Sequence, residues 1–214
     1  WSGTKAFLRP VQHRANLTVR VGAHVDRLVF DTSETGKRAV GVTLVSSDEV
    51  LEARREVILA AGSIGSPQIL QLSGIGPSDV LQQHGLEVVH ELPGVGDNLQ
   101  DHLQIRTIFK VKHTVTLNQR VNSLFGKAAM GLEYLLFKTG PLTMPPSQLG
   151  AFAKSDASRP SANMEWHVQP LSLDKFGSPL HTFNAITPSV CNLQPTSRGH
   201  VRIQSPDPLR APAI

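Results

Sequence analysis

The segment Val57–Gly76 constrains the fold of this chain more than any other part of the sequence. It opens with the apolar run Val57–Ala61, which predicts a strand buried on both faces, as in a parallel sheet. Ser66 and Pro67 then fit the N-cap and the first position of a helix, and Gly74 fits the position just past its C-terminus. The segment therefore predicts a strand–turn–helix unit of Rossmann-like type.

Two interpretations of this unit stay open. Small residues at the carboxyl end of a buried strand let a ligand approach the backbone, and glycine permits the dihedral angles that such a contact requires. The alternative is a generic strand–turn–helix unit that is packed only for stability.

The rest of the chain indicates two domains of mixed structure. Alternating apolar residues predict an antiparallel meander with strands at 16–30, 39–45 and 50–54 and a turn at 31–37. Further strands are expected at 104–111, 148–154, 164–168 and 200–204, and helices at 78–85 and 123–138. We place the boundary near residues 103–106, which gives domains 1–103 and 104–214. This order of elements indicates an α+β fold with an α/β portion of Rossmann type.

Composition and isolated residues exclude several functional classes. Hydrophobic residues make up 40% and charged residues 18% of the chain, as in ordinary globular proteins. The net charge of +4 is scattered along the sequence, so no nucleic-acid partner is expected. The single cysteine, Cys191, excludes an internal disulfide and is expected to be a buried inert thiol. None of the nine histidines shows H-x-x-x-H spacing, so no metal site is expected, although His167, His181 and His200 could line a pocket.

The glycine-rich segment Gly94–His102 is not expected to bind a nucleotide. Leu99 stands where a G-x-G-x-x-G loop has its third glycine, and no lysine follows at the spacing of a phosphate-binding loop. The neighbouring Asp101 and His102 fit either a catalytic pair or a hydrogen-bonded structural anchor.

The two ends of the sequence suggest an internal segment of a larger protein. The chain begins with Trp1, shows no signal peptide and has no apolar run near the ~18 residues of a membrane helix. We therefore expect a cytoplasmic location.

The segment Gly62–Gly76 is similar to the second signature of the glucose–methanol–choline oxidoreductases. Segments 16–25, 92–102 and 195–208 also resemble that family, so the resemblance covers almost the whole chain. Within the family, the resemblance is to bacterial proteins similar to choline dehydrogenase.

The resemblance implies an FAD-binding domain followed by a substrate domain on an antiparallel sheet. It implies that a base removes the proton of an alcohol while a hydride passes to the flavin, which gives an aldehyde or ketone. By this resemblance Val25 meets the adenine end of FAD, and Ala61 and Gly62 lie near the flavin. Asn98, Asp101 and His102 are expected to hold the domain junction.

The sequence departs from the family pattern in three places. It contains neither the dinucleotide fingerprint nor the catalytic histidine, so no catalytic residue is assigned and the isolated chain is expected to be inactive and to hold FAD weakly. In choline-specific members a glutamate precedes the strand equivalent to Leu149–Phe152, and here that position is Gln148, whose neutral amide argues against choline. Two other functions stay open: a non-catalytic module that binds a ligand or partner, and a flavin-containing lyase of the same family.

Overall fold

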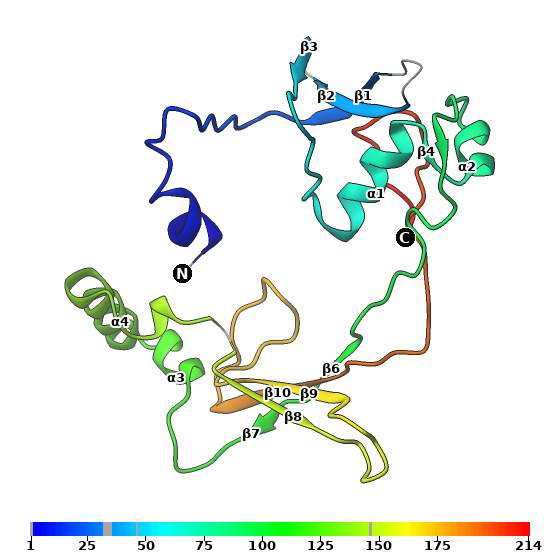
Figure 1. The fold of residues 1–214 in the computed structure, drawn as a ribbon. Coiled ribbons are helices and arrows are strands. Elements are labelled where there is room, and N and C mark those ends of the chain that lie inside the picture. The colour runs from blue at the N-terminus through cyan, green and yellow to red at the C-terminus, as the bar shows by residue number, and fades with distance from the viewer. Residues whose placement is uncertain (1, 32–35, 46, 146) are drawn as a thin grey trace. The chain divides into compact units, whose positions relative to one another are not determined.

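The computed structural model describes residues 2–31, 36–45, 47–145 and 147–214, which form two compact units (Figure 1). The first unit contains Trp1–Leu99 and Arg198–Ile214, and the second contains Gln100–Ser197. The C-terminal segment belongs to the first unit because Leu99 and Gly199 exchange backbone hydrogen bonds of 2.9 and 2.8 Å. The division predicted from sequence placed these last residues with the second domain instead.

The first unit contains a three-stranded antiparallel sheet in the order β1–β2–β3. These strands are β1 (Val25–Asp31), β2 (Arg38–Leu44) and β3 (Ser47–Glu52), and a short π-helix, η1 (Thr4–Leu8), precedes them. The predicted antiparallel meander is confirmed, although residues 16–24 do not join the first strand. The predicted turn at 31–37 lies largely outside the described residues.

Helix α1 (Gly62–Leu72) follows the sheet and confirms the predicted helix, but it begins before Ser66. Pro67 therefore lies inside the helix, and Ser66 Oγ accepts a hydrogen bond of 3.1 Å from the Ala61 amide. Gly74 follows the C-cap with a φ of 78°, as predicted. The unit continues with β4 (Ile75–Gly76), α2 (Ser78–Gln83) and β5 (His90–Glu91), and β4 pairs with β5 in parallel.

Two strands predicted from sequence are wrong. The run Val57–Ala61 belongs to no strand, and Ile58 is 78% exposed. A strand that is buried on both faces lies in a sheet whose two faces are covered by other elements. In the described part of the chain no strand pairs with this run. The predicted strand at 200–204 is reduced to a single bridge between Arg202 and Ala213.

The second unit is built on an antiparallel sheet in the order β6–β10–β9–β8, with β7 also paired to β10. The strands are β6 (Gln104–Arg106), β7 (Phe109–Lys110), β8 (Leu149–Ala153), β9 (Met164–Gln169) and β10 (Ala185–Asn192). The sequence analysis missed β10, which contains Pro188. Proline is normally confined to sheet edges. On one side of β10 the pairing is interrupted opposite Pro188, in the gap between β6 and β7. In this gap Thr107 donates to the Pro188 carbonyl from its amide at 3.1 Å and from its hydroxyl at 2.9 Å.

Helices α3 (Leu117–Asn122) and α4 (Leu124–Phe137) and the 3-10 turn η2 (Pro141–Thr143) complete the second unit. The helix predicted at 123–138 is confirmed, with Ser123 as its N-cap. Met130 of this helix is buried, whereas four of its leucines are exposed: Leu124, Leu132, Leu135 and Leu136. In the described residues, every helix is too short or too polar to span a lipid bilayer. The α+β fold class is confirmed.

Candidate functional site

A cavity of about 320 Å³ in the first unit joins the start of β1 to the first turns of α1. It brings together Val25 and Ala61, which the sequence analysis singled out as cofactor contacts and which lie far apart along the chain. The cavity is lined by Ala23, His24, Val25, Ala61, Gly65, Gln68, Ile69, Leu72 and Pro208. Most of these side chains are small or apolar, so a flat apolar group can approach the backbone here.

Small residues keep the N-terminal end of α1 open. Gly62 does not line the cavity but adopts a φ of 80°, a conformation that favours glycine. A β-carbon on Gly65 would lie 3.0 Å from the Ala61 β-carbon, so a larger side chain at either position would crowd the other. Gly65 and Ala61 therefore help to determine the shape of the cavity, whereas the sequence analysis had not identified Gly65 as a lining residue.

Helix α1 is fixed to β1 and to the C-terminal segment by buried hydrogen bonds. The Ser73 hydroxyl accepts a bond of 2.8 Å from the Leu28 amide in β1. The Gln71 side chain is completely buried; its Nε2 donates to the carbonyls of Val95 (3.2 Å) and Val201 (2.9 Å), and its Oε1 accepts from the Ile203 amide (2.9 Å). The Ser73–Leu28 bond holds β1, which begins at Val25, against the C-terminal end of α1.

The glycine-rich loop 94–96 contributes to packing in the first unit. Gly96 accepts a bond of 2.7 Å at its carbonyl from the Val201 amide, and Arg202 Nη1 donates to the Val95 carbonyl at 2.8 Å. Arg202 also pairs with Asp97. The loop carbonyls and Asp97 are thus occupied by contacts within the chain.

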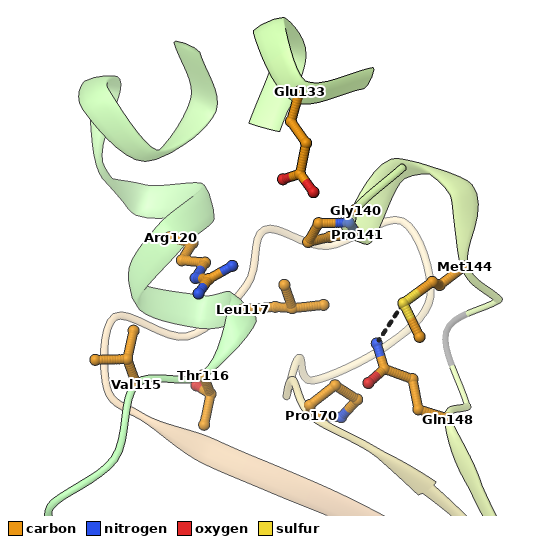
Figure 2. A pocket seen from close by; sticks show the side chains of 10 residues that line it. All are labelled: Val115, Thr116, Leu117, Arg120, Glu133, Gly140, Pro141, Met144, Gln148 and Pro170. Carbon is orange, nitrogen blue, oxygen red and sulfur yellow. Dashed lines mark hydrogen bonds between the residues drawn. The ribbon is translucent and has the colours of Figure 1, made fainter. Parts of the chain in front are cut away.

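The second unit contains a cavity of about 350 Å³ between α3, the end of α4 and the start of β8 (Figure 2). Figure 2 shows the Arg120 guanidinium and the Glu133 carboxylate directed toward its interior. Gln148 lines the same cavity, and its Nε2 lies 3.8 Å from Met144 Sδ. The remaining lining residues are Val115, Thr116, Leu117, Gly140, Pro141 and Pro170. Both signs of charge are therefore available to a small polar ligand.

The other residues singled out from sequence are dispersed. Cys191 is buried, as predicted, and burial raises the pKa of its thiol, with a further increase in pKa from the Glu165 carboxylate. His181 bonds Ser172 and Asp174, at 3.0 and 3.1 Å, and stacks on Phe183. His167 belongs to the second unit and His200 to the first. Asp101 and His102 are both exposed.

The sequence analysis missed Arg120 and Glu133 as cavity residues. Each is an isolated charge in a helix, and only the return of the chain through η2 places Glu133 next to Gly140 and in the same cavity as Gln148. No spacing pattern in the sequence indicates such a grouping.

The chain matches a known family model and aligns with known proteins along its whole length. Residues 1–104 match the family model described as GMC oxidoreductase. The whole chain aligns with oxygen-dependent choline dehydrogenases of Stenotrophomonas maltophilia (strain K279a), at 37% identity, and Brucella anthropi, at 38% identity. The chain spans 38% of the length of each of these relatives.

Solved structures agree on the fold. A formate oxidase of Aspergillus oryzae RIB40 matches 95% of this chain with a TM-score of 0.83 at 24% identity, over 40% of its own length. A pyridoxine 4-oxidase from Mesorbium loti matches 96% of this chain with a TM-score of 0.71 at 26% identity, over 36% of its own length.

Proposed function

Because the chain belongs to the glucose–methanol–choline oxidoreductase family, we propose that the protein containing it is an FAD-dependent oxidoreductase that converts the CH–OH group of an alcohol to an aldehyde or ketone. The flavin, when bound, supplies the hydride acceptor for this reaction. In this proposal the residues of this chain bind the flavin and the alcohol and orient them. None of these residues is assigned as the catalytic base.

The cavity beside Val25 and Ala61 supports this proposal most directly. A volume of about 320 Å³ lies at the lower end of the range for ligand pockets, which suits one end of a dinucleotide better than the whole molecule. Its small, apolar lining fits a planar ring such as adenine, and Val25 and Ala61 are the residues that would hold it. In this proposal Ala61 serves the adenine end of FAD, whereas the family resemblance implied a position near the flavin.

We further propose that the first unit serves the cofactor and the second unit the substrate. The second cavity offers charged and amide groups that suit a polar alcohol. Gln148 carries no charge, so the amide cannot attract a quaternary ammonium group as a carboxylate would. The Glu133 carboxylate lines the same cavity and attracts cations, so the neutral Gln148 alone does not exclude a cationic alcohol. The proposed substrate class is therefore a small polar alcohol. The cytoplasmic location expected from the sequence stays a prediction.

The proposal is tested with the full-length protein that contains these residues. Ala61→Leu should fill the cavity and lower the flavin bound per polypeptide several-fold, whereas Ala60→Leu should not, because Ala60 is exposed and does not line the cavity. Flavin content is measured by absorbance after gel filtration. Anaerobic addition of alcohols to the unsubstituted protein should then bleach the flavin band.

The outcomes separate the competing functions. Bound flavin that no alcohol reduces would favour a lyase of the family. A full-length protein without any flavin would leave a non-catalytic binding module. Equal flavin contents in the two variants would show that the Val25–Ala61 cavity is not part of the cofactor site.

A further inference from the structure

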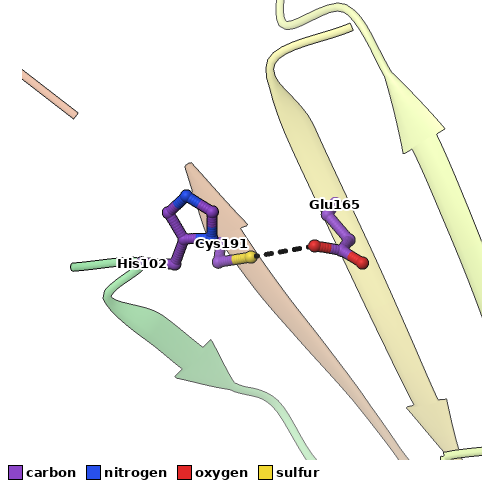
Figure 3. Close-up of side chains that lie close together, drawn as sticks. All are labelled: His102, Glu165 and Cys191. Atoms are coloured by element: carbon purple, nitrogen blue, oxygen red, sulfur yellow. Dashed lines mark hydrogen bonds between the residues drawn. The ribbon is translucent and has the colours of Figure 1, made fainter. Parts of the chain in front are cut away.

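Three side chains that can bind a metal converge in the second unit (Figure 3). One ligand atom from each of His102, Glu165 and Cys191 lies within 4.8 Å of the other two. We propose that this cluster is a binding site for a zinc-type divalent cation, with a ring nitrogen, a carboxylate oxygen and a thiolate sulfur as its protein ligands. This inference goes beyond the proposed oxidoreductase function and does not depend on it.

The register of the sheet explains the convergence. Cys191 in β10 lies directly opposite Glu165 in β9 on one side and Gln104 in β6 on the other. Directly opposed residues of antiparallel strands project from the same face, so the thiol and the carboxylate are neighbours. His102 precedes Gln104 by two residues, which is the period that returns a side chain to the same face of an extended chain.

The combination of donor atoms selects the class of metal. Imidazole, thiolate and carboxylate are the three side-chain ligands of zinc in proteins, whereas magnesium and calcium prefer oxygen alone. Three protein ligands also leave one tetrahedral position for water or another small ligand. The cluster therefore has the composition of an open zinc site.

The distances allow a metal after small side-chain movements. In a tetrahedral zinc site with bonds of about 2.0–2.3 Å, neighbouring donor atoms lie roughly 3.3–3.8 Å apart. The three ligand atoms lie up to 4.8 Å apart, so the most distant pair must move about 1 Å closer together for a metal to bind. His102 is exposed and can turn toward the other two ligands, while the Cys191 side chain is buried and fixed by the sheet.

A neighbouring histidine, His167, already contacts one of the three ligands, Glu165, and a second contact joins two of the ligands to each other. Glu165 Oε1 lies 3.2 Å from His167 Nε2, and Glu165 Oε2 lies 3.8 Å from the Cys191 sulfur. A partner that orients a metal-binding carboxylate in this way is typical of the outer shell of metal sites. The exposure of His102 leaves a path for the ion from solvent.

The sequence does not indicate this cluster because its members are widely separated. No two of the three residues lie within one turn of a helix or within one hairpin loop, which are the spacings by which zinc sites are recognised. Only the pairing of β6, β10 and β9 brings them together.

The test uses the chain stripped of metal with a chelator and titrated with Co²⁺, which serves as a spectroscopic substitute for Zn²⁺. We expect saturation at one equivalent, with a near-ultraviolet charge-transfer band that reports a cobalt–thiolate bond. Zinc should displace the cobalt, and magnesium should not. Cys191→Ser should abolish the band and weaken zinc binding by at least about 100-fold.

A matched pair of histidine variants provides the control. His102→Asn should weaken zinc binding at least about 10-fold. His113→Asn should leave it unchanged, because His113 is exposed, lies outside the cluster and has a φ of 58° that asparagine tolerates. Absence of the thiolate band in the unsubstituted protein, or equal zinc affinities for the two histidine variants, would overturn the proposal; the first result does not depend on the folding of any variant.

Discussion

A β-carbon on Gly96 would lie 2.8 Å from Gln71 Nε2, so the loop that contains Gly96 is closed against the buried side chain that anchors α1. The same β-carbon would lie 2.2 Å from the Val201 carbonyl oxygen, and Gly96 has a φ of 84°. Space and backbone conformation both restrict this position to glycine. The glycine-rich loop thus serves the packing on which the Val25–Ala61 cavity depends.

Gly96→Ala should therefore destabilise the first unit by about 2–5 kcal/mol, from left-handed strain and overpacking together. Urea denaturation, followed by circular dichroism, measures the change. Gly94→Ala is the control, because a β-carbon there meets nothing within 4 Å. Similar midpoints for the two variants would show that the loop does not close on Gln71 in solution.

Gln71→Met should cost about 3–5 kcal/mol, although methionine is a good helix former of similar size. The change leaves the buried Ile203 amide without its acceptor. It also removes one donor each from the Val95 and Val201 carbonyls, which keep their bonds from Arg202 Nη1 at 2.8 and 3.3 Å. Gln83→Met, on the exposed surface of α2, should have an effect within about 0.5 kcal/mol. The comparison is made by equilibrium unfolding at a fixed pH and salt concentration. A difference below 1 kcal/mol between the variants would contradict the assigned bonds.

The parts of the fold that could be predicted are those determined by local pattern. The β1–β3 meander and the ends of α4 follow from alternation and from Ser123 as a cap. The strand prediction for Val57–Ala61 failed because hydrophobicity shows only that a segment can be buried. It does not show that neighbouring elements are present to bury it. Strand β10 was missed because Pro188 argues against a strand unless the gap in its partner is known.

The candidate sites show the same limit. Val25 and Ala61 were expected as cofactor contacts from the family resemblance, and the structure places them in one cavity. The grouping of His102, Glu165 and Cys191 depends on strand pairing across the second unit, and residue types along the chain carry no information on that register.

Asn118→Asp should strongly destabilise the second unit at neutral pH. Asn118 is completely buried, and its Nδ2 donates to the carbonyls of Ser172 (3.1 Å) and His181 (2.9 Å). A carboxylate would face those oxygens, so we expect a loss of about 3 kcal/mol or more. Burial would raise the folded-state pKa of the new carboxyl, so the variant should recover stability as the pH falls toward the unfolded-state pKa of aspartate.

Asn192→Asp is the control, because Asn192 is exposed and its Oδ1 already accepts a bond from Gln194. Thermal unfolding between pH 4 and 8 tests this, and a pH-independent difference between the variants would count against the Asn118 contacts.

Ser158→Ala should raise the pKa of Asp156. The Ser158 hydroxyl and then the Ser158 amide (at 3.0 Å) are the main groups that hold the pKa of this exposed carboxyl below its ordinary value. A lowered folded-state pKa stabilises the turn above the unfolded-state pKa, and that contribution is lost as the pH falls through the folded-state pKa. The variant keeps the amide bond, so its NMR titration midpoint should move only part of the way back. Ser161→Ala, in the same loop, should leave the midpoint unchanged, since the Ser161 hydroxyl is bonded by Gln194. Equal midpoints for Ser158→Ala and the unsubstituted chain would mean that the hydroxyl does not bond Asp156 in solution.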